Sequence, residues 1–240
     1  MIPLVAQVRA ELRLLARNGE QVLLTLGIPV LLLVFFSTVD VLPTGGGKAV
    51  DFLAPGVLAL AVMSTAMVGL GIATGFERSY GVLKRLGATP LGRGRLVAAK
   101  VATILLVEVA QVAVLAAIAA ALGWRPGGGW ALVPAPVVLG TAAFAGIGLV
   151  LAGRLPGTVN LAAANGLYLL LLLLGGMVVN LDKLPTPLRV VAKALPSGAL
   201  SEALRRAFAS DHRVPGWSLA VLAAWAVAMP LAAAFTFRWE

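Results

Sequence analysis

Long runs of apolar residues dominate the pattern along this chain. Five runs carry no charge, and each has about the 20 residues that a helix needs to cross a bilayer. A sixth run holds Lys100 near its start and Glu108 near its middle. Helices suit lipid because they pair their own backbone groups, and the alternating short strands of a large barrel are not seen. The pattern predicts an all-α polytopic membrane protein with six transmembrane helices, at about 21–42, 52–75, 96–122, 130–153, 157–180 and 216–237.

The segment ahead of the first span, residues 2–18, predicts an amphipathic interfacial helix. Arginines recur every fourth residue on one side of it, at Arg9, Arg13 and Arg17. Apolar residues recur at helical spacing on another side, at Leu4, Val8, Leu12 and Leu15. A positive flank that only fixes the orientation of the first span is the alternative interpretation.

Composition supports the membrane assignment. The chain is 60% hydrophobic and 12% charged, against about 45–50% and about 25% in soluble domains. This excludes an ordinary soluble protein, a disordered chain and, with no cysteine, a disulfide scaffold. The net charge of +9 falls between apolar runs, so we interpret it as membrane orientation rather than binding to nucleic acid. The basic residues modestly favour both termini in the cytoplasm.

The loop between the second and third predicted spans is strongly basic and predicts a short charged helix over 77–86. Glu77 lies in its first turn, and Lys84 and Arg85 lie in its last, which suits the helix dipole. Thr89 and Pro90 would end the helix. Such an element on the cytoplasmic side suits docking of a soluble partner, and a merely solvated loop helix is the alternative.

The segment 182–213, between the fifth and sixth spans, predicts two short amphipathic helices separated by prolines. They would lie in the outer membrane interface or re-enter it. Apolar positions mark one face of the first helix, at Leu188, Val191, Ala192 and Leu195, and of the second, at Leu200, Leu204 and Phe208. Glu202, Arg205 and Arg206 lie around the other side of the second helix.

Two blocks of this sequence resemble the permease subunits of type-2 ABC transporters, of the daunorubicin-exporter kind. The first is the pattern E-x-x-x-G-[TV]-L-x-x-L-x-x-TP-x-x-R followed by a lysine, matched by Glu77, Gly81, Val82, Leu83, Leu86, Thr89, Pro90, Arg93 and Lys100. The second is a glycine-containing fifth span, two Leu-Pro pairs and a helix, matched by Gly175–Gly176, Leu184–Pro185, Leu195–Pro196 and 199–208. Ser79–Tyr80 and the lack of an aromatic-Ser-Gly triplet in the fifth span depart from the family pattern.

The resemblance implies one permease domain over residues 1–240 in a bacterial inner membrane. It would export a hydrophobic small molecule, drug or lipid-like cargo, in contact with membrane lipids. Two ABC ATPase subunits and a second permease, identical or homologous, would complete the complex. The residues implied in coupling to the ATPase are Glu77, Arg78, Gly81, Leu83, Lys84, Arg85, Leu86, Pro90 and Arg93.

This chain is expected to be non-catalytic and to hold no cofactor or metal. It lacks the Gly-x-x-x-x-Gly-Lys-[Ser/Thr] phosphate loop, so ATP and Mg²⁺ would be bound by the partner ATPase. The sole histidine, His212, has no ligand cluster around it in the sequence. A secondary transporter and a lipid-modifying membrane enzyme are the alternatives, but no internal repeat or clustered acid groups favour them.

Polar residues inside the predicted spans are candidates for a translocation path. A carboxyl group near the middle of a span is costly, so Glu108 predicts either a polar patch with Gln111 or a hydrogen-bonded contact between helices. The remaining candidates lie in or beside the fifth span, at Asn165, Tyr168 and Met177. The pairs Gly71/Gly75 and Gly148/Ala152 predict close helix packing.

Overall fold

The described structure is built from helices joined by short turns. The computed structural model describes residues 2–17, 19, 23–39, 48–87, 92–178 and 181–237. The α-helices are α1 (Ile2–Arg17), α3 (Ile28–Thr38), α4 (Ala49–Met63), α5 (Leu70–Ser79), α6 (Val82–Gly87), α7 (Gly92–Ala121), α8 (Pro134–Arg154), α9 (Gly157–Leu174), α10 (Thr186–Ala194), α11 (Pro196–Phe208) and α12 (Gly216–Thr236). Two π-helical turns, η1 (Leu23–Gly27) and η2 (Ser64–Gly69), precede α3 and α5, and 3₁₀ turns form η3 (Trp130–Leu132) and η4 (Leu181–Lys183).

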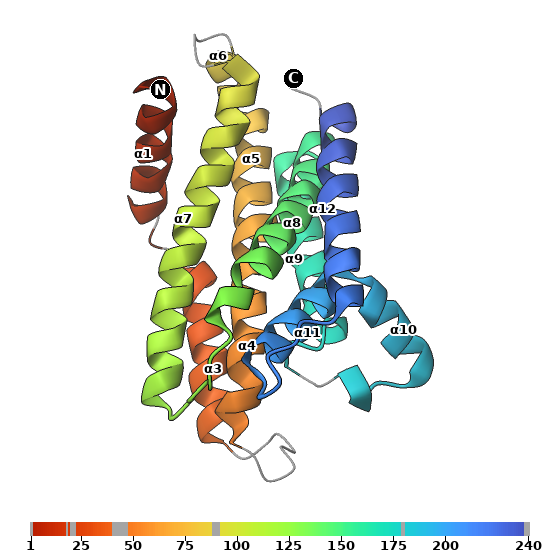
Figure 1. The fold of residues 1–240 in the computed structure, drawn as a ribbon. Coiled ribbons are helices and arrows are strands. Elements are labelled where there is room, and N and C mark those ends of the chain that lie inside the picture. Colours follow the sequence, from red (N-terminus) through yellow and green to blue (C-terminus); the bar gives the residue numbers. More distant parts are fainter. Residues whose placement is uncertain are drawn as a thin grey trace.

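The spans form a bundle around one central helix. The stretch α4–η2–α5 runs without a break from Ala49 to Ser79, and 83% of its most apolar window is buried. The corresponding fraction for α12 is 11%, so α12 lies on the outside of the bundle. In Figure 1, α1, α6 and the last turn of α12 lie at one end of the bundle, and α10 and α11 lie at the opposite end.

Five of the six predicted spans are confirmed as helices long and apolar enough to cross a membrane. They are Ala49–Ser79, Arg95–Ala121, Trp130–Arg154, Gly157–Leu174 and Gly216–Thr236. The first predicted span, 21–42, is not confirmed at that length, because its described apolar helix covers only Thr25–Thr38. The fifth ends at Leu174, earlier than the predicted 180, because Gly175 ends the helix and Gly176 has a φ of +66°.

The N-terminal segment forms the predicted amphipathic helix α1. Its predicted apolar face, at Leu4, Val8, Leu12 and Leu15, is the half-buried one, and Arg9, Arg13 and Arg17 are exposed. The helix packs beside α7, along the upper half of that helix in Figure 1. The four-residue spacing therefore identified which side of α1 contacts the bundle.

The two short helices predicted between the fifth and sixth spans are present as α10 and α11, and α11 packs into the bundle. Leu200 and Leu204 are fully buried, and α11 contacts α4, α8 and α12. Glu202 and Arg206 form an ion pair of 3.0 Å, but Arg205 turns inward over the ring of Phe52, 3.7 Å from its centroid. Burial lowers the pKa of Arg205 to about 10, so it remains charged at neutral pH.

Close packing of α5 against α8 depends on the predicted small residues. A Cβ atom on Gly148 would lie 2.6 Å from the backbone oxygen of Met67 and 3.3 Å from the Cα of Gly71. The two backbones therefore touch, which is how helices associate in lipid without a hydrophobic driving force. The predicted packing of Gly71 and Gly148 is confirmed.

We expect Gly148→Ala to destabilise the protein by about 1–3 kcal/mol, because the added methyl meets a rigid backbone oxygen. Gly216→Ala is the matched control, since a Cβ atom there meets nothing within 4 Å. Thermal unfolding of both variants in detergent checks this. Equal melting temperatures for the two would contradict the packing argument.

Candidate functional site

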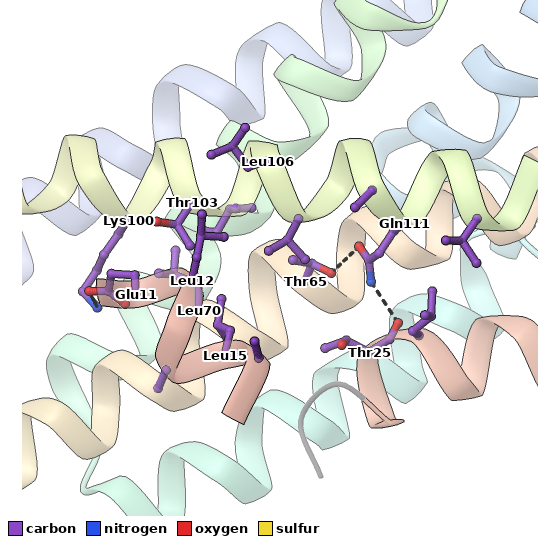
Figure 2. Close-up of a pocket in the computed structure, with 18 residues that line it drawn as sticks. Glu11, Leu12, Leu15, Thr25, Thr65, Leu70, Lys100, Thr103, Leu106 and Gln111 are labelled. Carbon is purple, nitrogen blue, oxygen red and sulfur yellow. Dashed lines mark hydrogen bonds and ion pairs between the residues drawn. The ribbon is translucent and has the colours of Figure 1, made fainter. Parts of the chain in front are cut away.

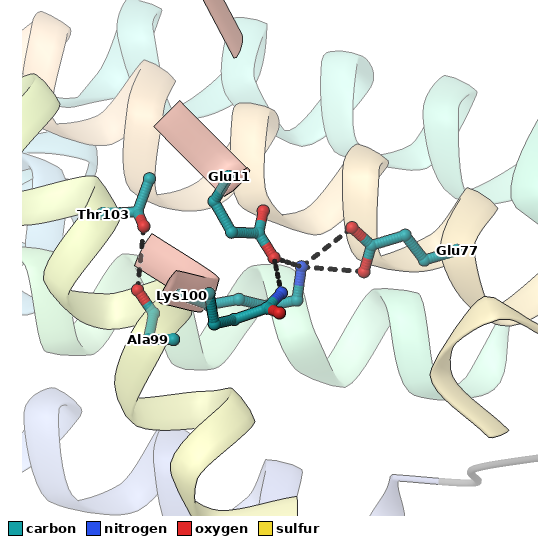
Figure 3. Close-up of polar contacts among 6 residues, drawn as sticks. Glu11, Glu77, Ala99, Lys100 and Thr103 are labelled. Carbon is teal, nitrogen blue, oxygen red and sulfur yellow. Dashed lines mark hydrogen bonds and ion pairs between the residues drawn. The ribbon is translucent and has the colours of Figure 1, made fainter. Parts of the chain in front are cut away.

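A buried lysine holds two carboxylates at the end of the bundle that carries α6. Lys100 on α7 is 6% exposed, and its Nζ lies 3.2 Å from a carboxylate oxygen of Glu11 on α1. The same Nζ lies 2.7 and 2.9 Å from the two carboxylate oxygens of Glu77 on α5. Figure 3 shows the ammonium group between the two acids. One cation therefore ties three helices together where the predicted coupling segment begins.

The predicted coupling segment is two helices and not one. The expected continuous helix 77–86 is wrong, because α5 ends at Ser79 and α6 begins at Val82. Gly81 separates them with a φ of +67°, a conformation that favours glycine. The amides of Tyr80 and Gly81 close the turn by donating to Phe76 and Arg78.

The base of this segment is fastened to the neighbouring spans. Arg78 donates from both terminal nitrogens, at 2.7 Å each, to the backbone oxygens of Gly153 and Leu155, beyond which α9 begins. The amide of Gly157 donates to the Ser79 hydroxyl at 3.2 Å. Since Glu77 contacts Lys100, the end of α5 is joined to α1, α7, α8 and α9.

The far part of the segment presents one apolar and one charged side. Leu83 is buried against Leu96 of α7, with Leu86 and Phe237 packed beside them. Tyr80, Lys84 and Arg85 are exposed. Of the remaining coupling candidates, Pro90 lies outside the described residues, and so does the side chain of Arg93. Tyr80, Lys84 and Arg85 therefore form a small positively charged surface. It lies beside the end of α5, which is fixed to the neighbouring spans.

The carboxyl group of Glu108 faces α8. Its Oε2 accepts from the Thr141 hydroxyl at 2.6 Å, and that hydroxyl also lies 2.8 Å from the backbone oxygen of Val137. The hydroxyl therefore lies within hydrogen-bond distance of two oxygens, one on α7 and one on its own helix, α8. Of the two interpretations, the structure fits the contact between helices, here between α7 and α8.

Gln111 faces a different neighbour and joins the two π-helical turns. Its side-chain oxygen accepts from Thr65 of η2 at 2.7 Å, and its nitrogen donates to the backbone oxygen of Thr25 in η1 at 3.0 Å. Gln111 also lines an apolar groove of about 330 Å³ between α1, η1, η2, α5 and α7. Figure 2 shows the groove with Lys100 toward one end and Gln111 toward the other.

The five candidate path residues do not gather at one site. Glu108 and Gln111 bond to different helices, and of the five only Gln111 lines the groove. Asn165 is exposed on α9 and donates to Leu161 of its own helix at 3.0 Å. Tyr168 is buried with no hydrogen-bond partner for its hydroxyl, and Met177 is buried where its backbone oxygen accepts from Arg205. Their role in transport stays a prediction.

Sequence reasoning missed two residues of this framework. Glu11 was not singled out, although a lysine inside an apolar run needs buried partners and Glu11 is an acid on the amphipathic helix nearby. The second is Asn160 on α9, which donates to the backbone oxygen of Gly71 at 2.8 Å. Among the described residues no group of three or more possible metal ligands occurs.

We expect Lys100→Met to destabilise the protein by about 3–5 kcal/mol, because it leaves two carboxylates without their cation. Adding Glu11→Gln and Glu77→Gln to the same variant should restore much of the loss. Lys84→Met, at an exposed lysine of α6, is the control and should change stability little. Unfolding in detergent checks all three, and a triple variant no more stable than Lys100→Met would contradict the ion cluster.

Comparison with known proteins places these features in a family. The family model described as ABC-2 type transporter matches residues 4–209, from α1 to the end of α11. No curated protein matches the chain. The match covers the Lys100 cluster, the coupling segment and the groove, and it confirms the resemblance drawn from the two sequence blocks. The chain therefore belongs to the ABC-2 type transporter family and is a multi-pass membrane permease subunit.

Proposed function

We propose that this chain is the permease of an ATP-driven exporter and that a separate ABC ATPase drives it through residues 77–87. The observation that supports this proposal most directly is how residues 77–87 are arranged. It ends in an exposed surface of Tyr80, Lys84 and Arg85, while its base is held by Arg78 and by Lys100. The ATPase would bind ATP and Mg²⁺, and this chain would hold neither.

The contacts at the base suit the transmission of movement. A displacement of α6 by the ATPase would reach α8 and α9 through Arg78, since its guanidinium grips the connection between them. It would reach α1 and α7 through Glu77 and Lys100. Movement at one end would thus bias the arrangement of whole spans, which is what coupling between distant sites requires. Cargo of hydrophobic character would leave toward the side of α10 and α11.

We expect the double substitution Lys84→Glu and Arg85→Glu to weaken association with the ATPase by at least about tenfold, since misplaced charge at an interface costs several kcal/mol. Glu77 is not a suitable target, because its loss disturbs the ion cluster. The test uses the full chain co-expressed with an ABC ATPase encoded beside it and measures co-purification and ATP-driven transport in vesicles.

The matched control for this charge reversal is Arg125→Glu with Arg213→Glu, at the opposite end of the bundle. Those changes should leave assembly with the ATPase intact. Normal assembly and transport by the Lys84/Arg85 variant would contradict coupling through α6. Transport that persists without any ATPase and follows an ion gradient would favour the secondary transporter instead.

We propose that a second permease subunit packs against α9. The exposed side of this helix is apolar except for Thr158 and Asn165, which lie seven residues apart and so on one face. An exposed amide in the middle of a span is costly in hydrocarbon and favours a helix partner. Gly166, next to Asn165, leaves room for close approach, since nothing lies within 4 Å of the Cβ position.

Disulfide crosslinking tests this face directly, because the chain has no cysteine. We expect Asn165→Cys to give a crosslinked dimer when membranes are oxidised. Val227→Cys, 60% exposed on α12, should give none above background. Two differently tagged copies distinguish a pair of identical chains from a pair of homologues. Equal crosslinking at both positions would contradict α9 as the dimer face.

A further inference from the structure

The groove between α1 and α7 is mostly apolar, and each polar side chain that lines it already has a partner within the protein. Its apolar lining includes Leu12, Leu15, Leu70, Ile104, Leu106 and Val107. The polar residues that line it are already paired. Lys100 is bonded to Glu11, Gln111 to Thr65 and Thr25, and the Thr103 hydroxyl to the backbone of Ala99. Thr25, which also lines the groove, has an interaction partner as well.

This pairing defines the chemistry of an occupant. Sites for polar small molecules place a few free donors or acceptors to orient their ligand, whereas here each polar side chain of the lining already has a partner within the protein. A volume of about 330 Å³ is nevertheless in the range of ligand pockets. A hydrocarbon chain makes no demand for hydrogen bonds, so it fits these walls where a polar drug does not.

The shape of the groove also fits a hydrocarbon chain. It follows α7 from Lys100 to Val114, fourteen residues, which is about 21 Å at the rise of an α-helix. It is open on one side, where Leu106 is 52% exposed and Ala110 is exposed. In Figure 2 the wall at Lys100 and Glu11 and the bridge at Gln111 and Thr65 lie at opposite ends of the row of leucines.

The positive charge on α1 indicates which class of lipid would place its acyl chain in the groove. Apolar burial alone gives no preference, since bilayer hydrocarbon is as apolar as the groove. Arg9, Arg13 and Arg17 are exposed on the flank of α1 next to the residues that line the groove. Basic residues on an amphipathic helix attract anionic lipid by about 1 kcal/mol each.

We propose that the groove binds an acyl chain of an anionic phospholipid, with its headgroup against the arginines of α1. The headgroup would lie near the Lys100 end, and the chain would run along α7 toward Gln111. This assignment is independent of ATP coupling, because it concerns lipid bound to the permease alone. A cargo molecule in the groove is the competing occupant, which the experiment distinguishes.

The test uses the full chain in phosphatidylethanolamine vesicles with a trace of phosphatidylglycerol that carries a photoreactive diazirine at one chain end. Crosslinked residues are then mapped by mass spectrometry. We expect crosslinks on α1 and α7 in the groove to exceed those on the lipid-facing side of α12, where Leu231 and Phe235 are exposed. The α12 signal measures ordinary surrounding lipid in the same molecule.

Two sets of substitutions test the binding of the acyl chain and the binding of the headgroup separately. Ala110→Phe fills the groove and should reduce groove crosslinks to the α12 level. Ala117→Phe, seven residues on along the same face of α7 and also exposed, does not line the groove and should leave them unchanged. Replacing Arg9, Arg13 and Arg17 with Gln should lower the groove signal about tenfold or more. The same number of changes at Lys48, Arg125 and Arg213 should not.

Three results would overturn the proposal. Crosslinks spread equally over the groove and α12 would show that no lipid site exists. A phosphatidylcholine probe of the same chain that labels the groove as strongly as phosphatidylglycerol would show that charge does not select the occupant. Full labelling of Ala110→Phe would place the lipid outside the groove. Loss of ATPase association in the Lys84/Arg85 variant has no bearing on these results, so the two proposals fail separately.

Discussion

The absence of hydrogen-bonding partners in hydrocarbon is the constraint on which this structure depends. A polar side chain inside the bundle must find its partner on another helix, and each such pair decides which helices meet. Lys100 brings α1 and α5 to α7, Gln111 joins the two π-helical turns to α7, and Asn160 ties α9 to α5. Apolar surface alone could not choose among these arrangements, because every span is apolar.

Small residues are the second feature that determines which helices pack together. Where Gly71 meets Gly148, the backbones are close enough for dispersion contacts over the whole crossing. Asn160 reaches the Gly71 oxygen at that point, and a side chain at Gly75 would collide with its amide. The polar ties and the close packing therefore fall on the same central helix, which is why Ala49–Ser79 is the most buried span.

Hydropathy and spacing predicted much of the fold. The apolar runs located five spans to within a few residues, and the four-residue repeat of α1 identified its buried side. Prediction failed where backbone geometry decided the outcome. The break at Gly81 and the end of α9 at Leu174 both depend on glycines with positive φ, Gly81 and Gly176. The spacing of apolar residues does not predict these backbone conformations. The inward turn of Arg205 depends on Phe52, which is far away in the sequence.

The candidate site was harder to predict, for a related reason. The motif around Glu77 indicated the proposed coupling segment, but it did not separate residues that face outward from those that hold the base. Glu77, Arg78 and Leu83 hold other helices of this chain. Lys84 and Arg85 are exposed, and Arg85 reaches only the backbone oxygens of Tyr80 and Gly81 in the adjoining turn. Spacing along one helix also suggested that Glu108 and Gln111 act together. Three residues apart, they differ by about 60° around the helix, and that was enough for Glu108 to face α8 and for Gln111 to face the π-helical turns η1 and η2.

The fixed base and the turn at Gly81 have a joint mechanical consequence. A hinge needs a few residues that can absorb a change in φ and ψ between parts that stay rigid. Tyr80 and Gly81 lie between an α5 end that is tied at Glu77, Arg78 and Ser79 and an α6 held mainly by Leu83. The packing of Leu83 against Leu96 would carry part of any force on α6 past this turn. Because Leu96 lies on the same helix as Lys100, the proposed force on α6 would have two routes into the bundle, one through the turn to α5 and one through Leu83 directly to α7.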